Sequence, residues 1–148
     1  MTATFKHVLV ALDDSAHSEK VLQQALRPGL AERLRALLVV KDYGVAELAR
    51  ATFGPGPGPS SLHEQMLSQG RQQLERVLAH ALERGQNIDR LVSIADEPWQ
   101  SIIEHALNER CDLIVMGSGS LGSVSAALLG SQTAHVLSKA TMPVLIVR

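Results

Sequence analysis

The stretch LIVMGSGSLGSVSAALLGS, residues 113–131, joins a short apolar run to a run of glycine and small hydroxyl residues. The opening run, Leu113–Met116, has the length of a β-strand and is continuously apolar, which is typical of a strand buried on both faces of a parallel sheet. Beyond Ser131, the residues Ala134, Val136 and Leu137 have helical spacing. The stretch therefore predicts a strand, a glycine-rich loop and a helix of an α/β fold.

Four further apolar runs of strand length lie outward from this stretch, and segments with helical spacing separate them. The five predicted strands are Val8–Leu12, Ala36–Val40, Leu91–Ala95, Leu113–Met116 and Pro143–Val147. The predicted helices lie around residues 21–26, 62–82, 99–107 and 134–137. This alternation predicts the fold class α/β, with an open five-stranded parallel sheet and helices on both faces.

Proline and glycine interrupt the pattern at two places. Pro28 and Gly29 should end the first helix early. The stretch Phe53–Pro59 alternates glycine with proline and is predicted to be an irregular loop. The pieces on either side of it are too small to fold alone, so it is not read as a linker. We expect one domain over residues 1–148.

Composition narrows the function classes. The formal charge of −1 and the aromatic content of 3% lack the basic footprint and the stacking platforms of a nucleic-acid binder. The single cysteine, Cys111, excludes an internal disulfide framework and is expected to be a buried small hydrophobe. No apolar stretch approaches the roughly 18 residues of a membrane-spanning helix. A cytoplasmic location is expected.

Residues 117–134 have the chemistry of an anion cradle. Glycines allow backbone amides to approach a ligand closely, and a helix N-terminus offers unpaired N–H groups. The hydroxyl groups that could contribute hydrogen bonds belong to Ser118, Ser120, Ser123, Ser131 and Thr133. No charged side chain lies in this segment, and no lysine follows Gly130 as in a Walker loop. The alternative, a loop that only forms turns with Ser131 as an ordinary N-cap, stays open.

Acidic residues follow the first predicted strand as Asp13-Asp14-Ser15. They could hold a ribose hydroxyl or a hydrated Mg²⁺, or Asp14 or Ser15 could cap the next helix. The six histidines are scattered without a persuasive metal-ligand spacing, so no metal site is predicted. No nucleophile-elbow motif or catalytic triad can be argued from spacing, so no catalytic residue is assigned.

Five segments resemble the universal stress protein family. They are Lys6–Ser15, Ala95–Ile103, Cys111–Gly117, the Gly130-Ser131 pair and Met142–Val147. They occur in the family's order and span essentially the whole chain. The resemblance implies a Rossmann-like sheet of the adenine nucleotide α-hydrolase type with strand order 3-2-1-4-5. It also implies a stress-response role and, in one branch of the family, binding of ATP, ADP or AMP, with Mg²⁺ as a companion ion.

Matching the family's nucleotide site onto this sequence implies a role for each of eight residues. Asp13 would lie near the ribose, Val40 near the base, and Met116 and Gly117 at the floor. The residues implied at the phosphates are Gly130, Ser131, Gln132 and Thr133.

Binders in this family resemble one another in a glycine pattern that Gly117, Gly130 and Ser131 match. Ser120 replaces the middle glycine, with Gly119 beside it. Leu121 stands where a basic residue is common, and Asp14 and Asp96 stand where the family often has glycine. Two extra carboxylates would oppose phosphate binding unless a cation bridges them.

The family commonly dimerises through its last strand, and the sequence permits this. The residues expected at that edge are Val144, Leu145, Ile146 and Val147. Exposed apolar edges invite strand pairing. A second function hypothesis is a member that binds no nucleotide and acts as a protein-interaction module.

Three other expectations concern single segments or other classes. Residues 42–61 could fold over a ligand as a lid. A phospho-acceptor receiver domain would explain Asp13, Asp14 and Asp96, but it needs a lysine after strand five, which is missing. A flavodoxin-like carrier lacks the aromatic residues that would flank a flavin.

Overall fold

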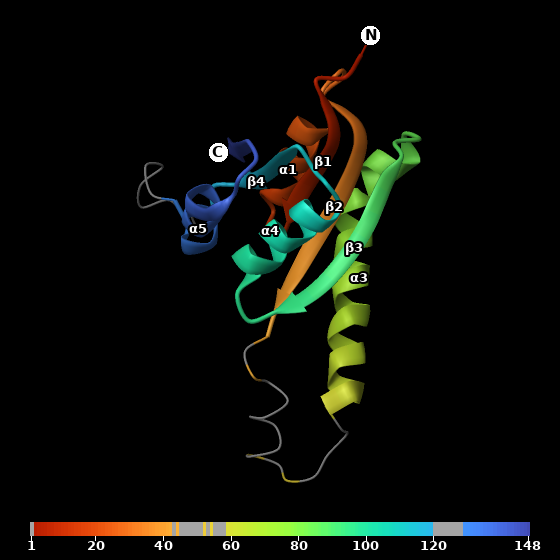
Figure 1. Cartoon of the computed structure of the whole chain (residues 1–148). Helices are drawn as coiled ribbons and strands as arrows, with labels where there is room; N and C mark the ends of the chain where they lie inside the picture. The colour runs from red at the N-terminus through yellow and green to blue at the C-terminus, as the bar shows by residue number, and fades with distance from the viewer. Residues whose placement is uncertain (1, 43, 45–51, 53, 55–58, 120–128) are drawn as a thin grey trace.

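One five-stranded parallel sheet organises the chain (Figure 1). The computed structural model describes residues 2–42, 44, 52, 54, 59–119 and 129–148. The strands are β1 (Phe5–Leu12), β2 (Ala31–Lys41), β3 (Ile88–Ala95), β4 (Leu113–Gly117) and β5 (Val144–Val147). Their spatial order is β3-β2-β1-β4-β5, which confirms the predicted fold class and strand order.

Helices cover both faces of the sheet (Figure 1). They are α1 (Ser18–Ala25), α3 (Pro59–Glu83), α4 (Pro98–Asn108) and α5 (Ser131–Lys139). α1 and α3 pack on the face that presents Val8, Val10 and Leu12 of β1. α4 and α5 pack on the face that presents Leu9. Because side chains alternate along a strand, the continuously apolar β1 supplies a core to each face.

The order in which strands are added to the sheet changes side at β1. From β1 the order runs through β2 to β3 on one side, and through β4 to β5 on the other. The register pairs Val10 with Ala36 of β2 and with Val115 of β4. Such a switch point leaves a crevice at the carboxyl ends of the two central strands.

Several boundaries differ from those predicted: β1 begins at Phe5 and β3 at Ile88, each three residues before its predicted start. β2 begins at Ala31, five residues before the predicted start at Ala36. The first part of β2 contains the charged residues Glu32, Arg33 and Arg35, so it shows no apolar run in the sequence. It is nevertheless part of the strand, since Arg33 pairs with β1 in register. Pro59 is the first residue of α3 rather than loop, because the first turn of a helix tolerates a residue without an N–H. Most of the predicted lid, 42–61, lies outside the described residues.

Two other local predictions are confirmed, the early end of the first helix and the burial of Cys111. α1 ends at Ala25, before Pro28 and Gly29. Cys111 is buried as a free thiol. Burial and the neighbouring Glu109 carboxylate raise the pKa of this thiol to about 11, so it stays protonated at neutral pH. Within the described part of the chain, no helix is long and apolar enough to cross a membrane.

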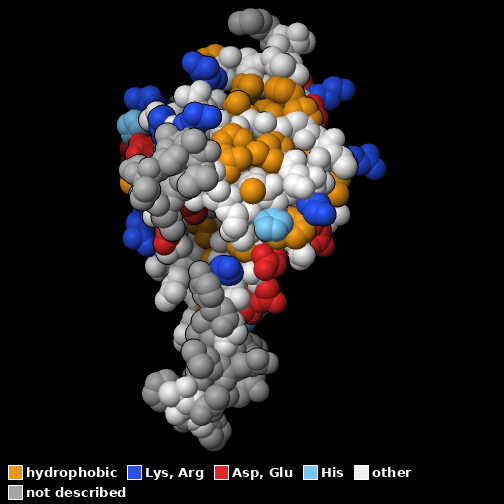
Figure 2. All heavy atoms as spheres, turned by 90° about the vertical axis from the view of Figure 1, so that its left-hand side faces the viewer, with side chains coloured by type: hydrophobic (Ala, Val, Ile, Leu, Met, Phe, Trp, Pro, Cys, Tyr) orange, Lys and Arg blue, Asp and Glu red, His pale blue; other side chains and the backbone are white. Residues whose placement is uncertain are grey.

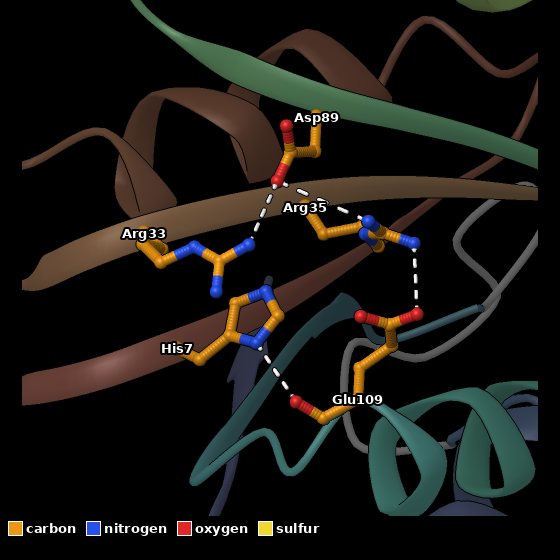
Figure 3. Close-up of polar contacts among 5 residues, drawn as sticks. All are labelled: His7, Arg33, Arg35, Asp89 and Glu109. Carbon is orange, nitrogen blue, oxygen red and sulfur yellow. Dashed lines mark hydrogen bonds and ion pairs between the residues drawn. The ribbon is translucent and has the colours of Figure 1, made fainter.

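Charged side chains join β2, β3 and the end of α4 at the amino end of the sheet (Figure 3). Arg35 contacts Glu109 at 3.1 Å and Asp89 at 3.9 Å. Arg33 reaches the same Asp89 carboxylate at 3.5 Å. Buried His7 donates from Nδ1 to the carbonyl oxygen of Glu109 at 3.0 Å. The network connects the last turn of α4 to three neighbouring strands.

Arg35→Ala should lower the free energy of unfolding by about 2 kcal/mol, less than for a fully buried pair because some water reaches the site. The side chain of Arg35 is only 20% exposed, and its removal leaves the Glu109 carboxylate half-buried without its cation. Urea denaturation measures this change. Arg33→Ala is the matched control: its side chain is 64% exposed, and the expected loss is below about 0.5 kcal/mol. Equal losses in the two variants would contradict the interpretation.

Candidate functional site

A cavity of about 700 Å³ lies at the carboxyl ends of β1 and β4, where the sheet switches direction. Its walls come from five regions: the end of β1 with the start of α1, the end of β2, the start of α4, the segment after β4 with α5, and Arg148 after β5. Its hydrophobic lining residues include Ala11, Leu12, Val21, Leu37, Val39, Ile102 and Met116. The cavity occupies the position that open α/β sheets use for ligands.

The contribution of β2 comes from Val39 rather than from the side chain of Val40. Val39 lines the cavity and packs with the α4 face of the sheet. Val40 packs with the opposite face, where its Cγ2 approaches Gly70 of α3. Neighbouring residues of a strand point to opposite faces, so a one-residue difference exchanges the two roles. The side chain of β2 that lines the cavity near this end is therefore Val39, one residue before the predicted Val40.

Asp13 is held in one conformation by the turn between β1 and α1. Its Oδ1 accepts hydrogen bonds from the Ser15 N–H at 2.9 Å and from the buried Ser18 hydroxyl at 2.8 Å. Partial burial would raise the pKa of the carboxyl, but these hydrogen bonds lower it below its ordinary value. The carboxylate is therefore ionised at neutral pH, with Oδ2 left to accept from a ligand hydroxyl.

Capping of α1 is not the role of the acidic pair. The N-cap of α1 is His17, with no side-chain cap. Asp14 and Ser15 therefore do not cap the helix as expected. Asp14 and Ser15 both line the cavity. Asp96 does not appear among the lining residues, and Glu97 is the N-cap of α4.

Gly119 and Gly130 meet backbone to backbone at the rim of the cavity. The Gly130 N–H donates to the Ser118 carbonyl at 2.8 Å. A Cβ on Gly130 would lie 2.7 Å from the carbonyl carbon of Gly119. Gly119 has φ +71°, and a Cβ there would lie 2.9 Å from Thr133 Oγ1. Both positions therefore require glycine.

A glycine with left-handed backbone directly precedes the position of the family pattern that Ser120 occupies. The left-handed backbone lies at Gly119, one residue before Ser120. Glycine alone adopts this conformation without a steric cost. Ser120, Leu121, Gly122 and Ser123 lie outside the described residues. The bend after β4 is thus present even though the motif position itself holds serine.

The remaining predicted phosphate residues are placed around the start of α5. Thr133 is buried and donates from Oγ1 to the Gly117 carbonyl at 2.9 Å. Gln132 lines the cavity and accepts from the Trp99 N–H at 2.8 Å. Gly130 is the N-cap and Ser131 the first helical residue, so the reading of Ser131 as N-cap is wrong by one position. Neither Gly130 nor Ser131 is a lining residue, although both adjoin those that are.

The sequence analysis did not place His17 or Arg148 at the cavity that both residues line. The His17 ring lies against Gly117: a Cβ there would be 3.0 Å from His17 Cδ2. His17 Nε2 also lies 3.0 Å from the Val147 carbonyl oxygen. No motif signals either residue, because they come from opposite ends of the chain. Among the described residues, no group of three His, Cys, Asp or Glu side chains is placed to hold a metal ion.

The fold and the cavity define the class of protein: a doubly wound α/β domain with its cavity at the topological switch point. The family is more specific. The universal stress protein family model matches residues 4–148, and the chain belongs to this family.

Similar proteins span nearly the full length of the chain. A universal stress protein of Thermus aquaticus, named from the QAH/OAS sulfhydrylase 3′ region, is 31% identical over 97% of this chain and 99% of its own. The structure of MJ0577 from Methanocaldococcus jannaschii has a TM-score of 0.76 at 23% identity, covering 98% of this chain and 96% of its own. A family protein of Arabidopsis thaliana with AMP bound has a TM-score of 0.61 at 17% identity, covering 96% and 90%.

Proposed function

We propose that this chain is a regulatory stress-response protein that binds an adenine nucleotide, ATP in preference, and acts as a homodimer. The contact between Gly119 and Gly130, beside the N-terminus of α5, carries the nucleotide proposal. A backbone stripped of side chains at a helix N-terminus suits a phosphate group. The AMP bound to the Arabidopsis relative supports the ligand class.

The cavity offers suitable groups for the base, the ribose and the phosphates of a nucleotide. The apolar lining residues Leu37, Val39 and Met116 suit the adenine base. The ionised Asp13 suits a ribose hydroxyl through its remaining oxygen. Gly117, Gly119 and the residues that open α5 would then face the phosphates. This arrangement supports the predicted site, with Val39 in the packing position.

A second carboxylate at the rim makes the phosphate end depend on a cation. Asp14 lines the cavity beside Asp13, and residues 117–134 offer no cationic side chain. Carboxylates and phosphates repel each other, and Mg²⁺ relieves this by binding oxygens of both. We therefore propose that Mg²⁺ accompanies ATP.

Calorimetric titration of the purified protein with ATP, with and without Mg²⁺, tests the nucleotide proposal. We expect micromolar binding that Mg²⁺ tightens, and weaker binding of adenosine, which lacks the phosphates. Adenosine also serves as the control for base and ribose recognition alone. No heat and no thermal shift at millimolar ATP would overturn the nucleotide proposal.

The proposed role is binding rather than catalysis, with slow ATP hydrolysis at most. Asp13, the carboxylate at the centre of the site, has a lowered pKa, which is the opposite of what a general base near neutral pH needs. A cytoplasmic location is part of this proposal.

The proposed dimer forms through β5, the edge strand beside β4. Figure 2 shows apolar side chains gathered on the side of the molecule where α5 and the C-terminus lie. The exposed large hydrophobic residues include Leu137 of α5 and Leu145 of β5, at 42% and 39% exposure. An unpaired edge with exposed apolar side chains favours symmetric strand pairing. The same surface would serve a different protein partner if the chain acts as an interaction module.

Leu145→Arg should convert the dimer to a monomer, because two symmetric copies of the edge would each bury an unpaired charge. Sedimentation velocity measures the oligomeric state. Leu107→Arg is the matched control, since Leu107 lies on α4 and is 52% exposed. We expect this control to stay dimeric. A monomeric wild-type protein, or a dimer that survives Leu145→Arg, would contradict the proposed edge.

A further inference from the structure

His17 lies between the cavity and the last strand. It lines the cavity, and its ring packs over the backbone of Gly117 at the end of β4. Its Nε2 is 3.0 Å from the carbonyl oxygen of Val147. A carbonyl oxygen can only accept, so Nε2 carries the hydrogen and donates it. In the neutral ring, Nδ1 is consequently the nitrogen without a hydrogen.

This arrangement leaves one nitrogen whose state depends on protonation. A neutral Nδ1 presents a lone pair, which repels a phosphate oxygen. A protonated ring donates from both nitrogens, so it can keep the Val147 contact and donate to an anion at the same time. Imidazole side chains change charge close to neutral pH, and a nearby anion favours the charged form.

Charged groups of both signs lie around His17 when the cavity is empty, and a bound nucleotide adds negative charge to them. Asp13 and Asp14 precede it in the turn. Glu19 and Lys20 follow on α1, Gly117 brings no charge from β4, and Arg148 follows β5. The phosphates of a nucleotide add several negative charges to this set, and residues 117–134 offer none of the opposite sign.

We propose that His17 takes up a proton from solvent when a nucleotide phosphate enters the cavity, and that the imidazolium donates from Nδ1 to the phosphate while Nε2 stays on Val147. The proposal rests on the proposed nucleotide binding and assigns the phosphate end of that site a cationic residue. No bond to carbon or phosphorus changes; the proton comes from water or buffer and returns on release. Nucleotide affinity should therefore fall as pH rises from 6 to 9, and it should fall less in His17→Gln.

Calorimetry in two buffers with different ionisation enthalpies, Tris and PIPES at pH 7, counts the protons taken up with ATP. His17→Gln is the informative variant, because its amide can still donate to the Val147 carbonyl but does not titrate. The terminal phosphate of the ligand also titrates near neutral pH, so the difference between wild type and variant is the measured quantity. We expect a sizeable fraction of one proton more in wild type, and no such difference with adenosine.

The outcomes separate this proposal from the one it rests on. No binding of ATP to the wild-type protein overturns the nucleotide proposal and this one with it. Binding with equal proton uptake in wild type and His17→Gln overturns the role of His17 alone. If the variant does not fold, NMR of the His17 ring in wild type at pH 7 decides: ATP must move its resonances toward those of a protonated imidazole, and resonances that do not move in this way overturn the proposal.

Discussion

Gly130→Asp is expected to abolish nucleotide binding, with ATP affinity at least about a hundredfold weaker than in wild type. Any Cβ at this position lies 2.7 Å from the carbonyl carbon and 3.0 Å from the Cα of Gly119. Both atoms belong to backbone, which cannot rotate away as a side chain can. The carboxylate also adds a negative charge at the helix N-terminus that would face the phosphates.

Gly130→Ala separates the steric effect from the charge. It should still weaken ATP binding strongly, because the contact with Gly119 already excludes a methyl group. Gly85→Ala is the control: φ is +79° there, but no atom lies within 4 Å of the added Cβ. This control should lose about 1 kcal/mol of stability by backbone strain and keep its ATP affinity. Gly130 variants that bind like wild type would show that the phosphates lie elsewhere.

Gly70→Leu should lower the free energy of unfolding by about 3 kcal/mol, and this is the largest expected effect on stability. Gly70 lies inside α3, where a Cβ would be 2.6 Å from Val92 Cγ1 and 3.0 Å from Val40 Cγ2. The helix thus approaches β2 and β3 more closely than a side chain allows. Helix propensity favours leucine over glycine by about 1 kcal/mol, which is too small to offset the overpacking.

Urea denaturation measures the effect of Gly70→Leu, and Gln69→Leu on the same helix is its control. Gln69 is exposed, so the added leucine meets no strand there. We expect a change within about 0.5 kcal/mol for the control. A Gly70→Leu protein as stable as wild type would mean that α3 can move away from the sheet at little cost.

Strand and helix positions were predictable where one pattern dominated a segment. The apolar run of β4 and the helical stripe of α4 both have the predicted type, because each is buried in a single way along its length. The start of β2 was missed, since its charged residues pair with β3 and α4 instead of entering the core. The predicted Val40 and the cavity-lining Val39 differ by one residue, which the alternation of side chains along a strand turns into opposite faces of the sheet.

The sequence shows the spacing of the glycines after β4, but it does not show which of them adopts a left-handed backbone or which segment packs against it. Spacing alone left the Ser120 position undecided. The structure places the left-handed backbone at Gly119 and brings that residue against Gly130, eleven positions later. Local sequence carries the preference of glycine for such a backbone, but not which distant segment then packs against it.

By itself, the sequence determined the α/β class, the alternation of five strands with helices, the glycine-rich segment after β4 and the resemblance to the universal stress protein family. These follow from local periods and local spacings. Only the tertiary structure decided which side chains share the cavity. His17 and Val147 are 130 residues apart in sequence yet hydrogen-bonded, because β5 ends beside the start of α1. Parallel strands bring their carboxyl ends to one edge whatever their separation along the chain, and no local pattern records that meeting.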